Sequence, residues 1–256
     1  MGGHLGARRG TAGGRSSGKG GAGGARGPRF RIDLLIFDLD GTLADTVHDI
    51  WRSTNVMRRA LGLTPLSLRT VRRHIGHGGR RVLGKVLPLA LRHSHDEAVG
   101  IFWAHHRAHL LDRSRLYPGV VETLRRFRRT PKVVLTNRAL GLALPLLKGL
   151  GIARHFRAVV GGDAVALAKP SPDPIWRLLE DFGAAADRAL MVGDSEVDIQ
   201  AGRAAGIHTC AVTYGYGAPA DLRAARPDFL IRQFSDLCRY VSRSGTAPRG
   251  RGGEGT

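Results

Sequence analysis

Charged and polar side chains stand at the ends of several apolar runs in this sequence. They are Asp38 and Asp40, Thr136 and Asn137, Lys169 in Ala-Lys-Pro, and Asp194 with Asp198. If the runs are parallel strands of one sheet, their carboxyl ends lie at one edge and these side chains meet there. Acids that lie so close together raise one another's pKa values and need a cation. Hard oxygen ligands of this kind suit Mg²⁺, which also pairs with substrate phosphate.

A single aspartate at such a position has a simpler interpretation. Asp is a common N-cap of helices and a common turn residue. Several strand ends that all carry polar groups favour a shared site over independent caps.

The apolar pattern predicts the sheet that would bring these ends together. Short runs rich in branched residues predict strands over Ile32–Asp38, Lys132–Asn137, Ala158–Gly161, Ala189–Asp194, Ile207–Thr213 and Asp228–Ile231. Stripes at helical spacing predict helices near Val120–Phe127, Leu140–Leu147, Ile175–Phe182, Val197–Ala205 and Ser235–Val241. This alternation predicts an α/β fold, a Rossmann-like parallel sheet covered on both faces.

Residues 46–116 interrupt the alternation. Apolar residues recur there at helical spacing, and no segment reads as a good strand. We predict a helical cap domain, inserted after the first strand, that covers the site as a lid. The predicted division is a tail over 1–29, a core domain over 30–45 and 117–242, the cap over 46–116 and a second tail over 243–256.

Composition limits the possible classes of protein. The 256 residues are 42% hydrophobic, enough for a sizeable core, and carry a formal net charge of +19. Residues 1–29 hold six basic residues, twelve glycines and no acid, so we expect that tail to be disordered. No apolar run approaches the ~20 residues of a membrane span, and no secretory signal is visible. Two cysteines fit a reducing compartment, so we expect a cytoplasmic protein.

The excess of basic residues favours anionic partners. Only five of the 40 basic residues are lysines, a ratio that genomic base composition produces as readily as phosphate-backbone binding. We therefore do not expect specific nucleic-acid binding. A non-enzymatic basic protein that binds nucleic acid through its Gly/Arg tails is the alternative from another class.

Four motifs, in this order, resemble those of the haloacid dehalogenase superfamily. They are Asp38-Leu-Asp-Gly-Thr42, the apolar run that ends in Thr136, Lys169-Pro170, and Gly193-Asp-Ser-Glu-Val-Asp198. The resemblance covers about residues 32–240, and the helical insertion matches the family's cap domain. Tyr117-Pro-Gly-Val, Thr136-Asn137, Gly193-Asp-Ser and Val212-Thr-Tyr-Gly-Tyr216 are similar to the phosphoglycolate phosphatase branch. Arg138 stands where that branch often has lysine.

The resemblance implies a catalytic role for four residues. Asp38 would be the nucleophile that forms an aspartyl-phosphate. Asp40 would protonate the leaving group and then accept a proton from water, with a pKa raised by its neighbours. Thr136 would bind a phosphate oxygen, and Lys169 would neutralise charge on the phosphate and on Asp38. The haloacid-cleaving members lack the second acid, so Asp40 argues for phosphoryl transfer.

The resemblance also implies the metal and substrate ligands. Asp38, Asp194 and the backbone carbonyl of Asp40 would bind Mg²⁺, with Asp198 as an outer support. Asn137 would join Thr136 and Lys169 in binding the substrate. His77, in Gly76-His77-Gly78-Gly79, would reach the substrate from the cap. A plain turn between helices is the other interpretation of that loop.

Eight of the eleven histidines lie within the insertion. His105 and His109 share a helical face with His93 and His95 nearby, so a transition-metal site is a second possibility there. No cysteine accompanies them, and arginine-rich surfaces often carry histidine.

The resemblance predicts an Mg²⁺-dependent phosphatase of a small phosphorylated metabolite, with 2-phosphoglycolate as the substrate. The alternatives within the superfamily are a phosphatase of another small phosphate, such as a sugar phosphate or pyrophosphate, and a phosphomutase. The sequence does not indicate the oligomeric state.

Overall fold

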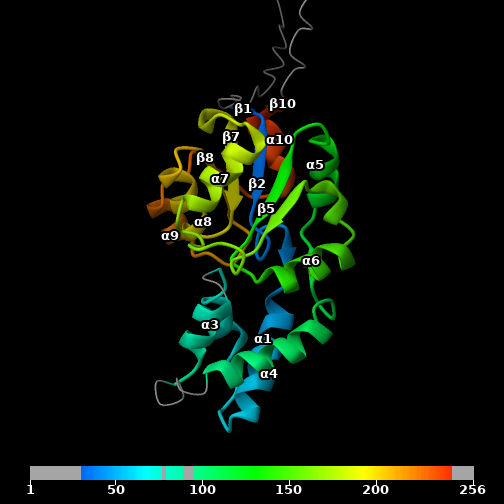
Figure 1. The fold of residues 1–256 in the computed structure, drawn as a ribbon, viewed down its shortest axis with the longest axis vertical. Helices are drawn as coiled ribbons and strands as arrows, with labels where there is room; N and C mark the ends of the chain where they lie inside the picture. The colour runs from blue at the N-terminus through cyan, green and yellow to red at the C-terminus, as the bar shows by residue number, and fades with distance from the viewer. Residues whose placement is uncertain (1–29, 77–78, 89–94, 244–256) are drawn as a thin grey trace, which may run out of the picture.

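The computed structural model describes residues 30–76, 79–88 and 95–243 (Figure 1). Residues 1–29 and 244–256, and with them nearly all of both predicted tails, lie outside this part of the chain. His77 and His93 also lie outside it.

Six parallel strands form the central sheet (Figure 1). In spatial order they are β6 (Ala158–Val160), β5 (Lys132–Leu135), β2 (Leu34–Phe37), β7 (Ala189–Gly193), β8 (His208–Val212) and β9 (Phe229–Ile231). The strand β2 pairs with β5 on one side and β7 on the other. All six strands coincide with predicted ones, and the predicted parallel α/β sheet is confirmed.

Helices cover both faces of the sheet, as expected. Leu35 and Phe37 of β2 pack into the cluster that contains α5 (Val120–Arg126), α6 (Leu140–Gly149) and α10 (Leu237–Tyr240). Leu34 and Ile36 point to the other face, against α7 (Asp173–Phe182) and α8 (Glu196–Ala204). Because strand side chains alternate between faces, a strand buried on both sides is apolar throughout. This is why β2 reads Leu-Leu-Ile-Phe.

Short elements complete the core. One α-helix, α9 (Pro219–Ala224), was not predicted; it begins with proline and buries Leu222. The 3₁₀ helices are η2 (Ala153–His155), η3 (Ala186–Arg188) and η4 (Phe234–Asp236).

Two predicted elements are divided in the structure. The expected strand Ile32–Asp38 splits at Asp33, and Phe30–Ile32 forms a separate strand, β1, parallel to β10 (Val241–Arg243). Asp33 donates its backbone N–H to the Arg188 carbonyl instead (2.7 Å). The expected helix Ser235–Val241 is η4 followed by α10, and its last residue already belongs to β10.

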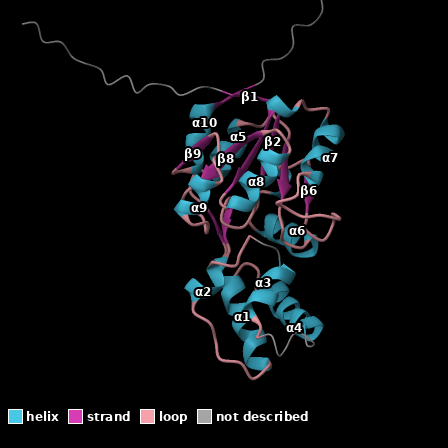
Figure 2. Cartoon of the chain, turned by 90° about the vertical axis from the view of Figure 1, so that its left-hand side faces the viewer, coloured by secondary structure: helices cyan, strands magenta, loops and turns pink. Residues whose placement is uncertain are grey.

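The segment 46–116 consists mainly of helices. They are α1 (Val47–Ala60), α2 (Leu68–Arg72), α3 (Gly79–Val86) and α4 (His95–Ala108). We call them the helical insertion. Met57, Val82, Val86, Ala98 and Phe102 form its own apolar cluster. Figures 1 and 2 show the insertion beyond the end of the sheet where β2 leads into α1.

The expectation that 46–116 contains no strand is wrong at its end. Arg115–Leu116 forms β4, antiparallel to β3 (Ala44–Asp45). The chain leaves and re-enters the core side by side, so the two connections satisfy each other's backbone groups. Two residues are too few to show a period in sequence.

Within the described residues, no helix has both the length and the apolar character needed to cross a membrane.

Candidate active site

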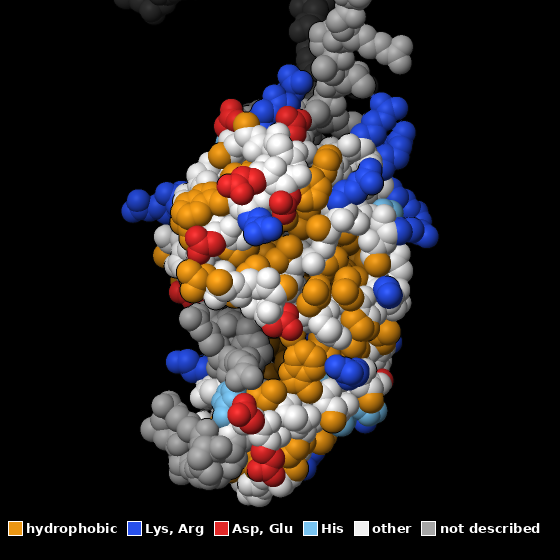
Figure 3. All heavy atoms as spheres, viewed as in Figure 1, with side chains coloured by type: hydrophobic (Ala, Val, Ile, Leu, Met, Phe, Trp, Pro, Cys, Tyr) orange, Lys and Arg blue, Asp and Glu red, His pale blue; other side chains and the backbone are white. Residues whose placement is uncertain are grey.

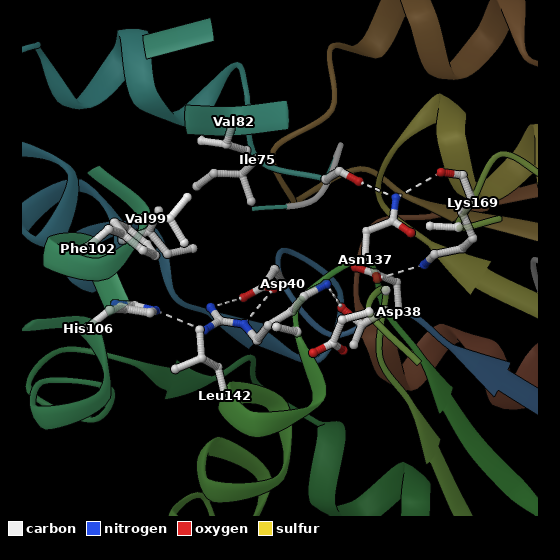
Figure 4. Close-up of a pocket in the computed structure, with 18 of the residues that line it drawn as sticks. Asp38, Asp40, Ile75, Val82, Val99, Phe102, His106, Asn137, Leu142 and Lys169 are labelled. Atoms are coloured by element: carbon white, nitrogen blue, oxygen red, sulfur yellow. Dashed lines mark hydrogen bonds and ion pairs between the residues drawn. The ribbon is translucent and has the colours of Figure 1, made fainter. Parts of the chain in front are cut away.

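A cavity of about 830 Å³ lies between the carboxyl edge of the sheet and the helical insertion. The core contributes Asp38, Asp40, Thr136, Asn137 and Lys169 to its lining. The insertion contributes mainly apolar side chains, Ile50, Ile75, Val82, Val99, Phe102 and Trp103, together with His106. Figure 3 shows a hollow at this junction, bordered by hydrophobic side chains. Figure 4 shows the labelled side chains converging from both regions.

Lys169 lies at the centre of the charged side chains. Its Nζ donates to Asp38 Oδ1 (2.8 Å), Asp198 Oδ1 (2.6 Å) and the Leu135 carbonyl (2.6 Å). An ammonium has three protons, so these acceptors use all of them. Burial alone would lower the pKa of Lys169, but Asp198 and Asp38 raise it above its usual value. The buried charge is therefore fixed in place.

Three buried carboxylates meet beside this lysine. Asp38, Asp194 and Asp198 offer oxygen atoms that all lie within 4.8 Å of one another. Burial, opposed by Lys169 and assisted by Asp198 and Asp40, raises the pKa of Asp38 to about 7. Burial, followed by Asp38 and Asp198, raises the pKa of Asp194 well above its usual value. Close-set oxygen donors with this excess of negative charge fit a hard divalent cation.

Asp194 and Asp198 of this trio have different hydrogen-bond partners. Asp198 uses Oδ1 for Lys169 and Oδ2 for the N–H and hydroxyl of Ser195 (3.1 and 2.7 Å), so it caps α8. Asp194 accepts from Tyr216 N on Oδ2 (2.6 Å) and from Thr42 Oγ1 on Oδ1 (3.3 Å). Asp198 is thus fully engaged within the protein, which fits a supporting position.

Gly41 allows the first and last motifs to approach each other. Its φ is +86°, a conformation that favours glycine, and a Cβ there would lie 2.1 Å from Asp194 Oδ2. The glycine in Asp-Leu-Asp-Gly-Thr is therefore required by contact across the site.

Asp40 is held by Arg138. The guanidinium donates Nε–H to Oδ2 (2.9 Å) and Nη2–H to Oδ1 (2.6 Å), and the Thr46 hydroxyl also donates to Oδ1. Burial would raise the pKa of Asp40, but Arg138 and Thr46 lower it below its usual value. The sequence-based expectation of a raised pKa is wrong here, because the arginine charge and the hydrogen bonds to Asp40 outweigh its burial.

Arg138 also contacts the helical insertion. Its Nη1 lies 2.8 Å from Nε2 of His106 on α4, and His106 Nδ1 lies 3.0 Å from Ser53 Oγ on α1. Burial and the arginine charge lower the pKa of His106 to about 3, so the imidazole is neutral. In the sequence, Arg138 stands out only as a departure from the phosphoglycolate phosphatase branch, and His106 is one of eight histidines in the insertion. His106 follows Phe102 by four residues, so both side chains lie on the same, buried face of α4. This spacing is the sequence signal that His106 is buried.

Thr136 and Asn137 follow β5 directly. Thr136 is 2% exposed, lines the cavity and accepts the Arg138 backbone N–H (3.2 Å). Asn137 Nδ2 donates to the carbonyls of Gly76 (2.8 Å) and Lys169 (2.9 Å). The amide therefore joins the core to the insertion loop that leads to His77. Gly76 itself lines the cavity, and His77 lies outside the described residues.

Two further histidines of the insertion, His105 and His109, have local partners. The rings of His105 and His109 stack with centroids 4.3 Å apart, and they bond to Ser53 and Asp112 respectively. In the described ranges, the acidic trio is the group with three possible metal-ligating side chains.

Comparison with known proteins gives one consistent family. A model of haloacid dehalogenase-like hydrolases matches residues 35–212. A phosphoglycolate phosphatase from Mesorhizobium japonicum is 37% identical over 210 residues, 80% of this chain and 92% of that protein. One from Chromobacterium violaceum is 36% identical over 216 residues, 80% of this chain and 95% of that protein.

Solved structures agree with the sequence relatives. A predicted phosphoglycolate phosphatase from Haemophilus somnus superposes with a TM-score of 0.74 at 29% identity, covering 81% of this chain and 97% of that one. CbbY from Rhodobacter sphaeroides, in complex with phosphate, gives 0.70 at 26% identity, covering 80% and 96%. The fold, the charged cavity and these matches together show that the chain is a hydrolase and belongs to the haloacid dehalogenase-like family.

Proposed function

We propose that this hydrolase removes phosphate from a small phosphomonoester, with 2-phosphoglycolate as the substrate. The observation that carries the proposal is the buried Lys169, which bonds to Asp38 at the wall of a cavity that the acidic trio adjoins. The curated relatives named phosphoglycolate phosphatase support the choice of substrate.

In the first step, Asp38 attacks phosphorus. Its Oδ1 accepts from Lys169, and among the described residues no hydrogen bond holds Oδ2, which is therefore the oxygen available for attack. The bond between phosphorus and the substrate's ester oxygen breaks, and Asp40 gives that oxygen a proton. The pKa of Asp40 is lowered while the site holds no substrate, and the negative charge of a bound phosphate would raise it again. The product alcohol leaves, and the phosphoryl group stays on Asp38 as an acyl phosphate.

In the second step, water attacks the phosphorus of this acyl phosphate. Asp40, now a carboxylate, takes a proton from the water, and the bond between phosphorus and the Asp38 oxygen breaks. Inorganic phosphate and the Asp38 carboxylate result. Asp40 carries the proton that the next substrate needs, so one group serves as acid and then as base.

We also propose Mg²⁺ as the cation, held by Asp38, Asp194 and the backbone carbonyl of Asp40, with Asp198 in support. When bound, the cation would supply positive charge that offsets the negative charge of the phosphate and the carboxylates. The negative charge of a phosphate dianion and two ionised aspartates exceeds the single positive charge of Lys169. Burial and the neighbouring carboxylates raise the pKa values of Asp38 and Asp194, and a bound cation would oppose both effects.

Thr136, Asn137 and His77 complete the proposed substrate site. Thr136 would donate its hydroxyl proton to a phosphate oxygen, because its Oγ1 already accepts the Arg138 N–H. Asn137 would hold the loop of the insertion that brings His77 to the substrate. The helical insertion would act as the cap that separates the cavity from bulk solvent.

The test is release of inorganic phosphate from 2-phosphoglycolate, with and without Mg²⁺, by wild type and by Asp38→Asn. We expect at least a roughly 10³-fold loss of activity in the variant, since it lacks the nucleophile. Asp33→Asn is the matched control, because Asp33 adjoins the opposite end of β2 and pairs with Arg188. Equal activity of wild type and Asp38→Asn would refute the nucleophile. A preference for a hexose phosphate or pyrophosphate in a substrate panel would refute the assigned substrate.

A further inference from the structure

A second, smaller pocket of about 350 Å³ lies at the edge of the sheet opposite the catalytic cavity. Strand β5 begins at Lys132 in this pocket and ends at Leu135, next to Thr136 in the catalytic cavity. The pocket lies between the loop that joins α5 to β5 and the segment that joins η2 to β6. We call it the basic pocket, because its lining contains no acidic residue and five cationic ones, Arg128, Arg129, Lys132, Arg154 and Arg157.

The positive charge of the basic pocket is not balanced by nearby carboxylates. None of its five cations takes part in an ion pair among the described residues. In Figure 3, Lys and Arg side chains gather on the side of the molecule where Figure 1 shows α5. Cations that lie so close together repel one another, and a bound anion would offset that repulsion.

Lys132 distinguishes the basic pocket from an ordinary arginine-rich surface. Its side chain is only 3% exposed, whereas the four arginines are exposed. Lys132 Nζ donates to the carbonyls of Phe127 (2.7 Å) and Thr130 (2.9 Å). These bonds fold the loop that carries Arg128 and Arg129 around the ammonium. An ammonium has three protons, and the described residues offer no acceptor for the third.

The pKa values of two lining residues reflect the same surplus of positive charge. Burial, followed by Arg157, lowers the pKa of Lys132 below its usual value. Burial, followed by Arg154 and Lys132, lowers the pKa of His155. The Nε2 atom of His155 is buried and has no hydrogen-bond partner within the described residues. Because unpaired buried polar groups cost free energy, an anion that paired with them would stabilise the folded protein.

The size and charge of the basic pocket indicate the class of ligand. Its volume is at the lower end of the ~300–1,000 Å³ range of small-molecule sites, so it suits a small molecule better than a nucleic acid. The planar guanidinium of arginine binds phosphate oxygens through paired N–H groups. Five cations exceed what one phosphate group can neutralise, and they suit a chain of two or more phosphates.

We propose that the basic pocket binds a phosphate chain, either inorganic or that of a nucleoside diphosphate. The third proton of Lys132 and the N–H groups of the surrounding arginines would donate to the phosphate oxygens. The site lies at the opposite edge of the sheet from Asp38 and shares no lining residue with the catalytic cavity. The proposal is therefore independent of the proposed phosphatase activity.

The test is isothermal titration calorimetry of the full-length protein with inorganic tripolyphosphate, in chelator and at about 0.15 M salt. We expect the double variant Arg128→Gln/Arg129→Gln to weaken binding at least roughly tenfold, because charge-assisted hydrogen bonds are lost. The matched control is Arg177→Gln/Arg223→Gln, which removes the same charge from exposed positions on α7 and α9. Its affinity should stay within about twofold of wild type, since both altered sites are outside the pocket.

Two lysine variants locate the bound ligand. Lys132→Met should weaken tripolyphosphate binding at least roughly tenfold, and thermal unfolding verifies that this variant is folded. Lys169→Met removes a cation from the catalytic cavity instead, and its affinity for tripolyphosphate should stay within about twofold of wild type.

Pyrophosphate, ADP and inorganic phosphate distinguish the sources of the phosphate chain. Both pyrophosphate and ADP should bind at least roughly tenfold more tightly than inorganic phosphate, because they engage more of the cations. Tighter binding of ADP than of pyrophosphate would identify a nucleoside diphosphate, and equal affinities would identify the phosphate chain alone.

Three results would overturn the proposal. The first is a wild-type protein that does not bind tripolyphosphate. The second is an equal loss of affinity in the two double arginine variants, which would show only the general attraction of a basic protein for anions. The third is loss of binding in Lys169→Met, which would place the ligand in the catalytic cavity. Phosphate release from 2-phosphoglycolate is measured separately, with Mg²⁺, so failure of the proposed function is seen there and not in the titrations.

Discussion

The sheet and the helical insertion border the same cavity but supply different chemistry to it. The core places Asp38 and Asp40 there from the end of β2 and Lys169 from the loop before α7, each buried and each bonded to a charged partner. The insertion supplies apolar side chains, and His106 is the titratable one among its described lining residues. Strand ends are held by neighbouring strands on both sides, so they can fix charges within fractions of an ångström. The helices provide a largely apolar wall that shapes the cavity.

The largest expected effect distinguishes the two buried lysines of the core. Lys169→Met removes the charge between Asp38 and Asp198, and we expect phosphatase activity to fall roughly 10²- to 10³-fold. Lys132→Met is the control, since Lys132 Nζ donates to the carbonyls of Phe127 and Thr130 (2.7 and 2.9 Å). We expect that variant to lose about 1–3 kcal/mol of stability while kcat stays near wild type. Activity assays with thermal unfolding check both, and similar kcat values for the two variants would contradict the comparison.

A smaller effect concerns stability and pH in the core. Asp38 has a pKa of about 7 in the folded state, above the model-compound value of 3.8. Between these two values the folded protein holds a proton that the unfolded chain has lost, so the free energy of unfolding falls as pH rises. Asp194 acts in the same direction, whereas Asp40, with its lowered pKa, stays ionised across the window.

The measurement is the unfolding midpoint at about pH 5 and about pH 7.5, with chelator or with Mg²⁺. In chelator we expect the midpoint to be several degrees lower at the higher pH, and Asp38→Asn to reduce that difference. Mg²⁺ should stabilise the protein more at the higher pH, where the carboxylates are ionised. An Mg²⁺ effect that is equal at both pH values would contradict a metal bound by these acids.

The smallest effect on catalysis is expected in the insertion. Val82 is 7% exposed and lines the cavity from α3. Val82→Ala should cost about 1–2 kcal/mol of stability through the cavity it leaves. We expect kcat to stay near wild type with a modest rise in KM, because no charge moves. A loss of kcat comparable to that of Lys169→Met would show that the apolar wall does more than shape the cavity.

The core was easier to predict from sequence than the insertion, for a physical reason. Strands buried on both faces must be apolar and short, so runs such as Leu34–Phe37 and Ala189–Gly193 were visible directly. The insertion was visible only as helical periodicity. The flanking pair β3–β4 escaped prediction because pairing between distant segments leaves no local pattern.

Within the site, too, some residues can be identified from the sequence and others only from the structure. Asp38 and Asp194 follow from their positions at strand ends and from their motifs. Lys169 follows from its Lys-Pro motif alone, because it lies in the loop between β6 and α7 and not at a strand end. The sequence around Arg138 does not indicate a role in the site. Only its distances to Asp40 and His106 place it there. The lowered pKa of Asp40 depends on that contact, and so the sequence-based expectation had the wrong sign.

The sequence by itself determined the sheet, the ordered motifs and the acids at its edge, because local apolar pattern and residue type are written in the chain. Tertiary structure decided which charges pair. Arg138 and Asp40 are 98 residues apart, and Lys169 and Asp38 are 131 apart. Ion pairing depends on distance and burial, which exist only after the crossovers have brought these segments together.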